Sequence, residues 1–182
     1  MTNTANATSG KKPRMLTGLF RDRASAERAY QAVSERGYDK HDVNLVMSDD
    51  TRQRHFSHAH PVETELGNKA AEGAGVGGAV GSTIGAIAAA IAAMGTSLVL
   101  PGLGLIVAGP LAAAIAGAGA GGVTGGLIGA LVGWGIPEER VKHYEAGIKE
   151  GGILLAVTPR SDEDAKYLEQ QWKLHDGEHI FL

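Results

Sequence analysis

Both ends of the chain alternate between short apolar runs and longer stretches in which apolar residues recur at every third or fourth position. A short apolar run bounded by polar or turn residues is typical of a strand. The pattern therefore predicts four strands, at Met15–Phe20, Val43–Met47, Ile153–Val157 and His179–Leu182. Because Ile153–Val157 is apolar at every position, we expect it to be a central strand.

Three amphipathic helices are predicted between these strands. Asp22 is a suitable N-cap for the first, over residues 23–36, and Gly37 supplies its C-terminal stop. Pro137 opens the second helix, and Ser161 begins a capping pattern for the third. Their buried faces are predicted to hold apolar residues spaced three and four apart, which are Ala26, Ala29, Tyr30 and Val33, then Val141, Tyr144 and Ile148, then Ala165, Leu168 and Trp172.

The order of these elements predicts an α+β fold. Without a long apolar insert and the helix after it, the chain reads as the ferredoxin-like βαββαβ arrangement. We expect this domain to comprise residues 14–48 and 135–182, with a Gly/Ala-rich helical hairpin at 73–134 inserted between the second and third strands. Residues 1–13 are predicted to be a disordered tail, and residues 49–72 a polar linker.

The insert has two rows of small residues spaced four apart. Residues 73–137 contain no Asp, Glu, Lys or Arg and hold most of the chain's 27 glycines. A step of four places all members of a row on one helix face, where another helix backbone can approach closely. We expect helix packing at the glycines of both rows, which are Gly73, Gly77, Gly81 and Gly85, then Gly117, Gly121, Gly125, Gly129 and Gly133.

The two predicted arms of the insert, residues 72–94 and 110–134, are each long enough to cross a membrane. At about 1.5 Å per residue an arm reaches roughly 35 Å, against about 30 Å for a hydrocarbon core. Only in a bilayer or a buried pair is a helix so rich in glycine expected to be stable. The link at 98–107 is strongly apolar, so we expect either a re-entrant loop or a further helical piece. A flexible Gly-rich linker is the weaker alternative, because such linkers are polar.

Charge and candidate chemistry narrow the function classes. A net charge of −3 argues against nucleic acid as a main partner, and the absence of Cys excludes thiol chemistry. His55, His58 and His60 can supply imidazoles to Zn²⁺ or Cu²⁺, but no acid or Cys completes a familiar site, so a solvated loop is the favoured interpretation. No nucleophile elbow or apolar pair of carboxylates is visible. We therefore predict no enzymatic activity and no cofactor.

Three stretches that flank the insert carry a family resemblance: Leu16–Phe20, residues 24–37 and, most specifically, residues 135–157. They resemble the bacterial general-stress-protein 17M-like, or heat-induced stress protein, domain. The resemblance implies a stress-associated bacterial protein without an established enzymatic activity, and it supplies no catalytic motif. Many relatives in that family also carry a Gly-rich apolar insert at this point.

Taken together, these features predict a non-enzymatic, stress-associated protein that oligomerises through a glycine-zipper hairpin in the bacterial inner membrane. Its α+β domain is expected on the cytoplasmic side, because Lys69, Arg140 and Lys142 flank the arms and the far side carries no charge. The expected partners are membrane lipid and further copies of the chain. Two alternatives stay open: a soluble homo-oligomer whose hairpins bury one another, and a small-molecule or metal-sensing module.

Overall fold

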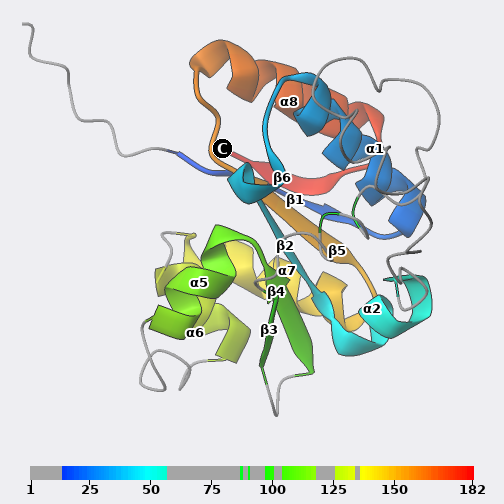
Figure 1. The fold of residues 1–182 in the computed structure, drawn as a ribbon, viewed down its shortest axis with the longest axis vertical. Helices are drawn as coiled ribbons and strands as arrows, with labels where there is room; N and C mark the ends of the chain where they lie inside the picture. The colour runs from blue at the N-terminus through cyan, green and yellow to red at the C-terminus, as the bar shows by residue number, and fades with distance from the viewer. Residues whose placement is uncertain are drawn as a thin grey trace, which may run out of the picture.

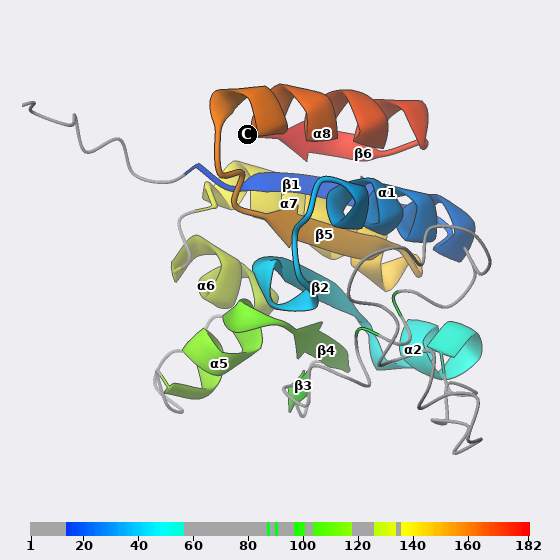
Figure 2. The same cartoon turned by 45° about the horizontal axis from the view of Figure 1, so that its top comes forward.

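Six antiparallel strands form one sheet in the part of the chain that the structure describes. The structure is a computed structural model, and it describes residues 14–56, 87, 90, 97–100, 104–117, 126–133 and 136–182. The strands lie in the order β3-β4-β2-β5-β1-β6, which Figure 2 shows from β6 at the top to β3 at the bottom. Their bounds are β1 Leu16–Phe20, β2 Val43–Ser48, β3 Ser97–Leu100, β4 Leu105–Ala108, β5 Ile153–Val157 and β6 Glu178–Phe181.

The four strands predicted at the ends of the chain are confirmed as β1, β2, β5 and β6. β5 lies between β2 and β1, and all of its residues are buried, as expected for a continuous apolar run. In this register Leu154 lies opposite Leu19 on one side and opposite Val46 on the other. The mixed α+β class is therefore confirmed, with more strands than the sequence predicted.

The three predicted helices are also present. Asp22 Oδ1 accepts a hydrogen bond from the Ser25 N–H at 2.9 Å, and Ser161 Oγ accepts one from the Asp164 N–H at 3.0 Å. Each bond satisfies a backbone donor that the first helical turn leaves free. Gly37 has a φ of +80°, the left-handed conformation that suits a helix end. The bounds are α1 Arg23–Glu35, α7 Glu138–Lys149 and α8 Asp162–Leu174, with a 3₁₀ turn, η1, at Lys40–Asp42.

Helices cover both faces of the sheet, so the fold has three layers (Figure 1). α1 and α8 pack on one face, over a core that includes Leu155 and Trp172. α7 packs on the other face, together with α5 (Pro110–Gly117) and α6 (Gly126–Gly133). Successive residues of β5 point to opposite faces, so Leu154 belongs to the second core and Leu155 to the first.

α7 lies very close to β1 because it has a glycine at the point of contact. A β-carbon on Gly147 would overlap with the side chain of Leu19, which is itself buried. Tyr144 and Ile148, on the same side of the helix, complete the contact with this core. Gly147 therefore sets the distance between the helix and the sheet.

The described parts of residues 97–108 differ from the expectation, because they form neither a re-entrant loop nor a helical piece. β3 and β4 form a hairpin, and β4 pairs with β2, so that Val107 lies opposite Val46 and Ile106 opposite Met47. The prediction was wrong because a short apolar run fits a buried strand as well as it fits a helix. The strand forms because β4 can pair with the edge of β2 that β5 does not occupy.

The second predicted arm begins at Pro110, as expected, but its described part consists of two short helices. α5 and α6 have 8 residues each. Among the described residues, no helix is long and apolar enough to cross a bilayer. Of the row glycines, Gly117 ends α5, and Gly129 and Gly133 lie in α6. The remaining ones lie outside the described residues, and they are Gly73, Gly77, Gly81, Gly85, Gly121 and Gly125.

The predicted polar linker begins with a helix that the sequence pattern did not reveal, α2 (Asp49–Phe56). Its first turn is acidic and its last turn is basic, which suits the helix dipole. Ser48 Oγ accepts a hydrogen bond from the Thr51 N–H at 3.0 Å and so caps the first turn. The rest of the linker, residues 57–72, and the tail predicted at 1–13 lie outside the described residues.

Candidate functional site

One buried amide of β2 anchors the insert to the rest of the chain. We call residues 14–56 and 136–182 the framework and residues 73–134 the insert. Asn44, 2% exposed, accepts a hydrogen bond at its Oδ1 from the Leu111 N–H at 2.7 Å. Its Nδ2 donates to the Ala156 carbonyl at 3.3 Å. Asn44 thus caps the first turn of α5 and ties that helix to β5.

The turn between β4 and α5 brings this helix to Asn44, and it requires glycine. Gly109 has a φ of +99°, and a β-carbon there would overlap with the Val43 carbonyl oxygen. The Gly109 carbonyl accepts a hydrogen bond from the Ala112 N–H at 3.0 Å, which begins α5. Any side chain at this position would push the turn away from β2.

A buried acid of α1 makes a second anchor. Glu27 is 3% exposed, and its Oε2 accepts a hydrogen bond from the Ile87 N–H at 2.9 Å. Its Oε1 accepts one from Arg23 Nε at 3.4 Å, so the buried charge is paired. Ile87 and Ala90, both in the first predicted arm, are buried in the same core as Phe56 of α2. Part of this arm therefore packs against the framework.

Sequence analysis missed both anchors, although each left a signal. Asn44 is the polar residue inside an apolar strand, and Glu27 follows Ala26 on the buried side of α1. A polar side chain at a core position is informative, because it needs a partner when it is buried. The partners Leu111 and Ile87 lie 67 and 60 positions away, and no local pattern identifies them.

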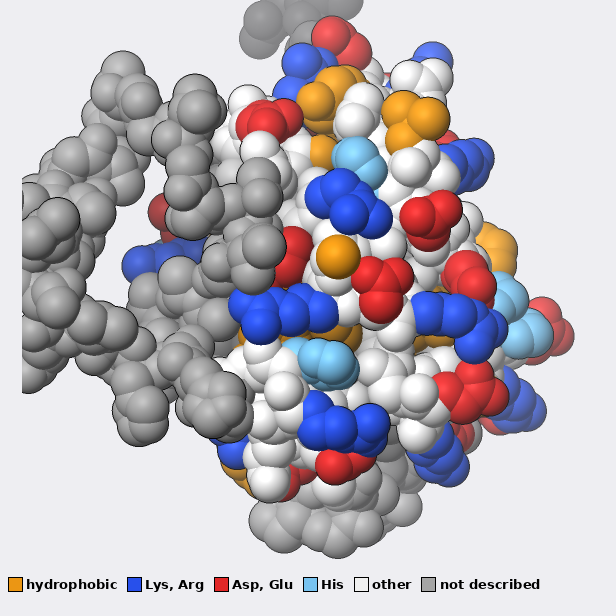
Figure 3. All heavy atoms as spheres, turned by 90° about the vertical axis from the view of Figure 1, so that its right-hand side faces the viewer, with side chains coloured by type: hydrophobic (Ala, Val, Ile, Leu, Met, Phe, Trp, Pro, Cys, Tyr) orange, Lys and Arg blue, Asp and Glu red, His pale blue; other side chains and the backbone are white. Residues whose placement is uncertain are grey.

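The described part of the insert presents an uncharged outer surface. Val99 on β3 and Val132 on α6 are 52% and 40% exposed. Gly133 is exposed, and a β-carbon built on it would have no atom within 4 Å in the described part of the chain, so no described residue packs against this member of the second row. The framework face at the right of Figure 1 differs, because acidic and basic side chains alternate over it with few hydrophobic atoms (Figure 3).

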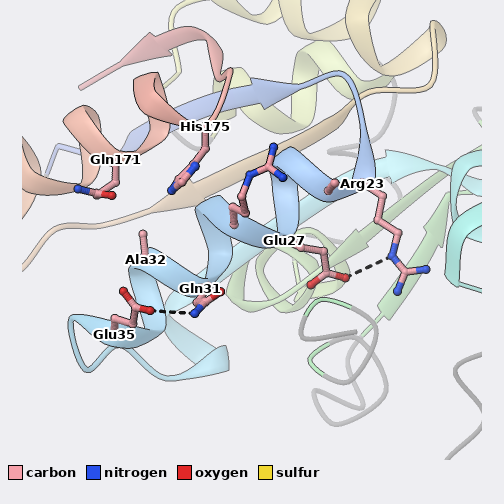
Figure 4. Close-up of a pocket in the computed structure, with 9 residues that line it drawn as sticks. Arg23, Glu27, Gln31, Ala32, Glu35, Gln171 and His175 are labelled. Carbon is pink, nitrogen blue, oxygen red and sulfur yellow. Dashed lines mark hydrogen bonds and ion pairs between the residues drawn. The ribbon is translucent and has the colours of Figure 1, made fainter. Parts of the chain in front are cut away.

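A cavity of about 600 Å³ lies between the outer side of α1 and the C-terminal end of α8 (Figure 4). Gln171 lines it from α8, and His175 lines it from the position directly after that helix. On the α1 side, Gln31 Nε2 donates to Glu35 Oε1 at 2.9 Å. The size suits a small molecule, and the lining mixes both signs of charge. The cavity therefore agrees with the small-molecule alternative without indicating a class of ligand.

The three histidines of the predicted metal site are described at one position alone. His55 is exposed in the last turn of α2, and its carbonyl accepts a hydrogen bond from Arg23 Nη1 at 2.5 Å. His58 and His60 lie outside the described residues. Within the described ranges, no group of three or more His, Cys, Asp or Glu side chains is placed to hold a metal ion.

A buried hydroxyl pair joins α7 to the β1–β6 edge of the sheet, and sequence analysis did not identify it. The Tyr144 hydroxyl donates to the His179 carbonyl at 2.9 Å and lies 2.7 Å from Thr17 Oγ1. Burial raises the pKa of Tyr144 to about 12, so the hydroxyl keeps its proton at neutral pH. The rings of His143 on α7 and His179 on β6 also stack, with centroids 4.7 Å apart. The arrangement holds α7 against β6.

No family model, curated protein or solved structure matches the chain. The likeness of residues 135–157 to a stress-protein domain accordingly stays a prediction from the sequence. What the structure contributes to function is the contrast between an uncharged insert surface and a charged framework, with Asn44, Gly109 and Glu27 at the junction.

Proposed function

We propose that the chain is a non-enzymatic, stress-associated bacterial protein whose insert mediates self-association at the inner membrane. One observation carries the proposal: residues 73–137 hold no charged side chain, and their described part still exposes Val99 and Val132. A region without charge can form an exposed apolar patch, which is the kind of surface that associates with lipid or protein. The framework, which holds most of the charged residues, is proposed to stay on the cytoplasmic side.

We extend the proposal to the architecture of the framework, as a ferredoxin-like domain with the insert between β2 and β5. Its support is the adjacency of the four framework strands, which follow one another as β2-β5-β1-β6 with α1 and α8 on one face. The same face of a βαββαβ unit carries both of its helices, since each crossover returns to the sheet with the same hand.

Fractionation of cells that express the full chain tests the membrane part of the proposal. The chain is expected to pellet with membranes and to resist carbonate and high-salt washes, because its attachment is apolar. Val132→Asp should reduce the pelleted fraction, since a charge in the apolar surface opposes insertion. Leu174→Asp is the matched control, because Leu174 is 72% exposed but belongs to α8 of the framework. Full recovery in the soluble fraction without detergent would contradict membrane attachment.

A soluble homo-oligomer is the second candidate, and the anchors of the insert favour it. Leu111 and Ile87 bond to framework side chains, and β4 pairs with β2, so these parts of the insert already have partners within the chain. In this alternative a second copy covers the remaining apolar surface. Sedimentation of the soluble fraction distinguishes the two: assembly without lipid supports this candidate, and assembly only in detergent or lipid supports the first.

A further inference from the structure

The two edges of the sheet differ in charge and in regularity. β6 forms one edge, where Glu178 Oε1 accepts a hydrogen bond from Arg21 Nε at 2.7 Å. His179 on this strand has a φ of +48°, and the pairing with β1 shifts register between Thr17 and Leu19. Charge and irregularity are the features that keep an edge strand from pairing with another chain. The β6 edge is therefore protected.

β3 forms the other edge and has none of these features. Its sequence Ser-Leu-Val-Leu contains no charge and no proline. Its pairing with β4 runs without a shift, from Ser97 opposite Ala108 to Leu100 opposite Leu105. Val99 is 52% exposed, and no strand in the described part of the chain pairs with the outer side of β3. A regular, apolar, exposed edge is a template for a further strand.

We infer that β3 is a dimerisation edge, which pairs antiparallel with β3 of a second copy so that one sheet continues through both chains. The inference rests on the proposed self-association and names its surface. An added strand bonds through its backbone N–H and C=O groups. The partner strand must also be uncharged, because residues 73–137 contain no opposite charge with which a charged side chain of that strand could pair. A second copy meets both conditions, since a two-fold axis places the same strand on each side.

The pleat of the sheet restricts how the two strands can align. Residues directly opposite in an antiparallel pair point to the same face, whereas successive residues point to opposite faces. Leu98 packs toward the core under α5, so Val99 points to the other face. The two-fold axis that relates the two β3 strands must therefore pass at one residue, which then lies opposite its own copy. It cannot pass between two residues, because residues that point to different faces would then lie opposite each other. Centring on Val99 places the two exposed Val99 side chains against each other.

Disulfide trapping tests this alignment directly, because the chain contains no cysteine. Val99→Cys places two thiols on opposed residues of neighbouring strands, at a separation of about 4.5–5.5 Å between Cα atoms that permits a disulfide. We expect a covalent dimer within minutes of mild oxidation of the full chain, in mild detergent if it fractionates with membranes. Val132→Cys, which is also exposed but lies on α6, is the control and should form such a dimer at least about tenfold more slowly.

A charge at the same position tests whether the edge holds the dimer together. Val99→Lys places like charges opposite each other, and it should raise the dimer dissociation constant by about tenfold or more. Sedimentation equilibrium measures this constant, and circular dichroism checks that the variant is folded. Leu174→Lys, on the framework helix α8, is the control and should leave the constant unchanged. Val132→Lys tests α6 as the competing contact.

The outcomes separate this inference from the proposed function. A self-associating parent with unchanged association in Val99→Lys and no preferential trapping of Val99→Cys would overturn the β3 edge and leave self-association in place. Loss of association in Val132→Lys alone would assign the contact to α6 and overturn the inference as well. A monomeric parent would contradict both the inference and the proposed self-association.

Discussion

The framework and the insert obtain their stability in different ways. The framework carries most of the charged residues, and its helices α1 and α8 are capped by their own neighbours Asp22 and Ser161. The insert has no charge, and the cap of α5 comes from Asn44, a framework side chain. β4 likewise completes its hydrogen bonds on β2. Elements without polar side chains of their own therefore depend on the framework for their polar contacts.

Glycine also has different roles in the two regions. In the framework, a β-carbon on Gly147 would overlap with the Leu19 side chain, and a β-carbon on Gly18 would crowd the Trp172 ring. In the insert, Gly133 belongs to a long row of small residues, but a β-carbon on it would meet no described residue. The number of glycines in a region therefore does not show which of them the fold requires.

Alkaline pH should lower the free energy of unfolding through the framework, because the buried tyrosines lie there. Residues 73–137 contain no side chain that titrates. Burial raises the pKa of Tyr30 and Tyr144 to about 12, above the value of about 10 in an unfolded chain. Their stabilisation is therefore complete below pH 10 and is lost as the pH rises through 12. Each tyrosine contributes about 2–3 kcal/mol.

Urea unfolding between about pH 9 and about pH 12 measures this loss. Tyr144→Phe removes one of these titrations and should make the decline with pH smaller by about the 2–3 kcal/mol of that tyrosine. A free energy of unfolding that stays constant over this range would show that the two hydroxyls are exposed to water. It would also contradict the packing of Tyr144 against Thr17.

Removing the anchor side chain should separate the insert from the framework. Asn44→Ala leaves the buried Leu111 N–H without an acceptor, which costs about 1–3 kcal/mol. The free energy of unfolding measures the cost, and faster exchange of the Leu111 amide shows where it arises. Gln53→Ala, on the exposed side of α2, is the control and should change stability by less than about 0.5 kcal/mol. Equal effects of the two changes would mean that Asn44 is not an anchor.

A pair of alanine substitutions compares the two kinds of glycine. Gly147→Ala gains helix propensity of about 1 kcal/mol but forces a methyl group against Leu19, at about 1–3 kcal/mol. We expect a net loss of up to about 2 kcal/mol in thermal or urea unfolding. Gly133→Ala meets no neighbour among the described residues and should leave stability unchanged or slightly higher. The comparison fails if Gly133→Ala is the more damaging change.

Local patterns in the sequence predicted most of the framework. The apolar run of β5, the caps at Asp22 and Ser161 and the buried face of α7 each depend on residues close together in the chain, so their signals are readable. Ferredoxin-like order and the stress-protein resemblance stay proposals. Membrane insertion and helix packing at the row glycines also stay proposals.

The insert was predicted less well, for physical reasons. Its residues are small and apolar throughout, so their periodicity does not separate a strand from a helix. β3 and β4 form because β2 offers an open edge, and α5 is placed by Asn44 and Gly109. These are contacts between residues far apart in sequence. A pattern within the insert contains no information about them.

Native-state hydrogen exchange of the β4 amides tests the central claim most directly, namely that the insert is built into the framework sheet. Amides of β2 and β5 should exchange only through global unfolding, because both strands are central and buried. If the claim is right, the β4 amides of Leu105–Ala108 that bond to β2 exchange with nearly the same free energy. Rapid exchange throughout β4, with β5 fully protected, would show that the insert is a separate unit and would contradict the account.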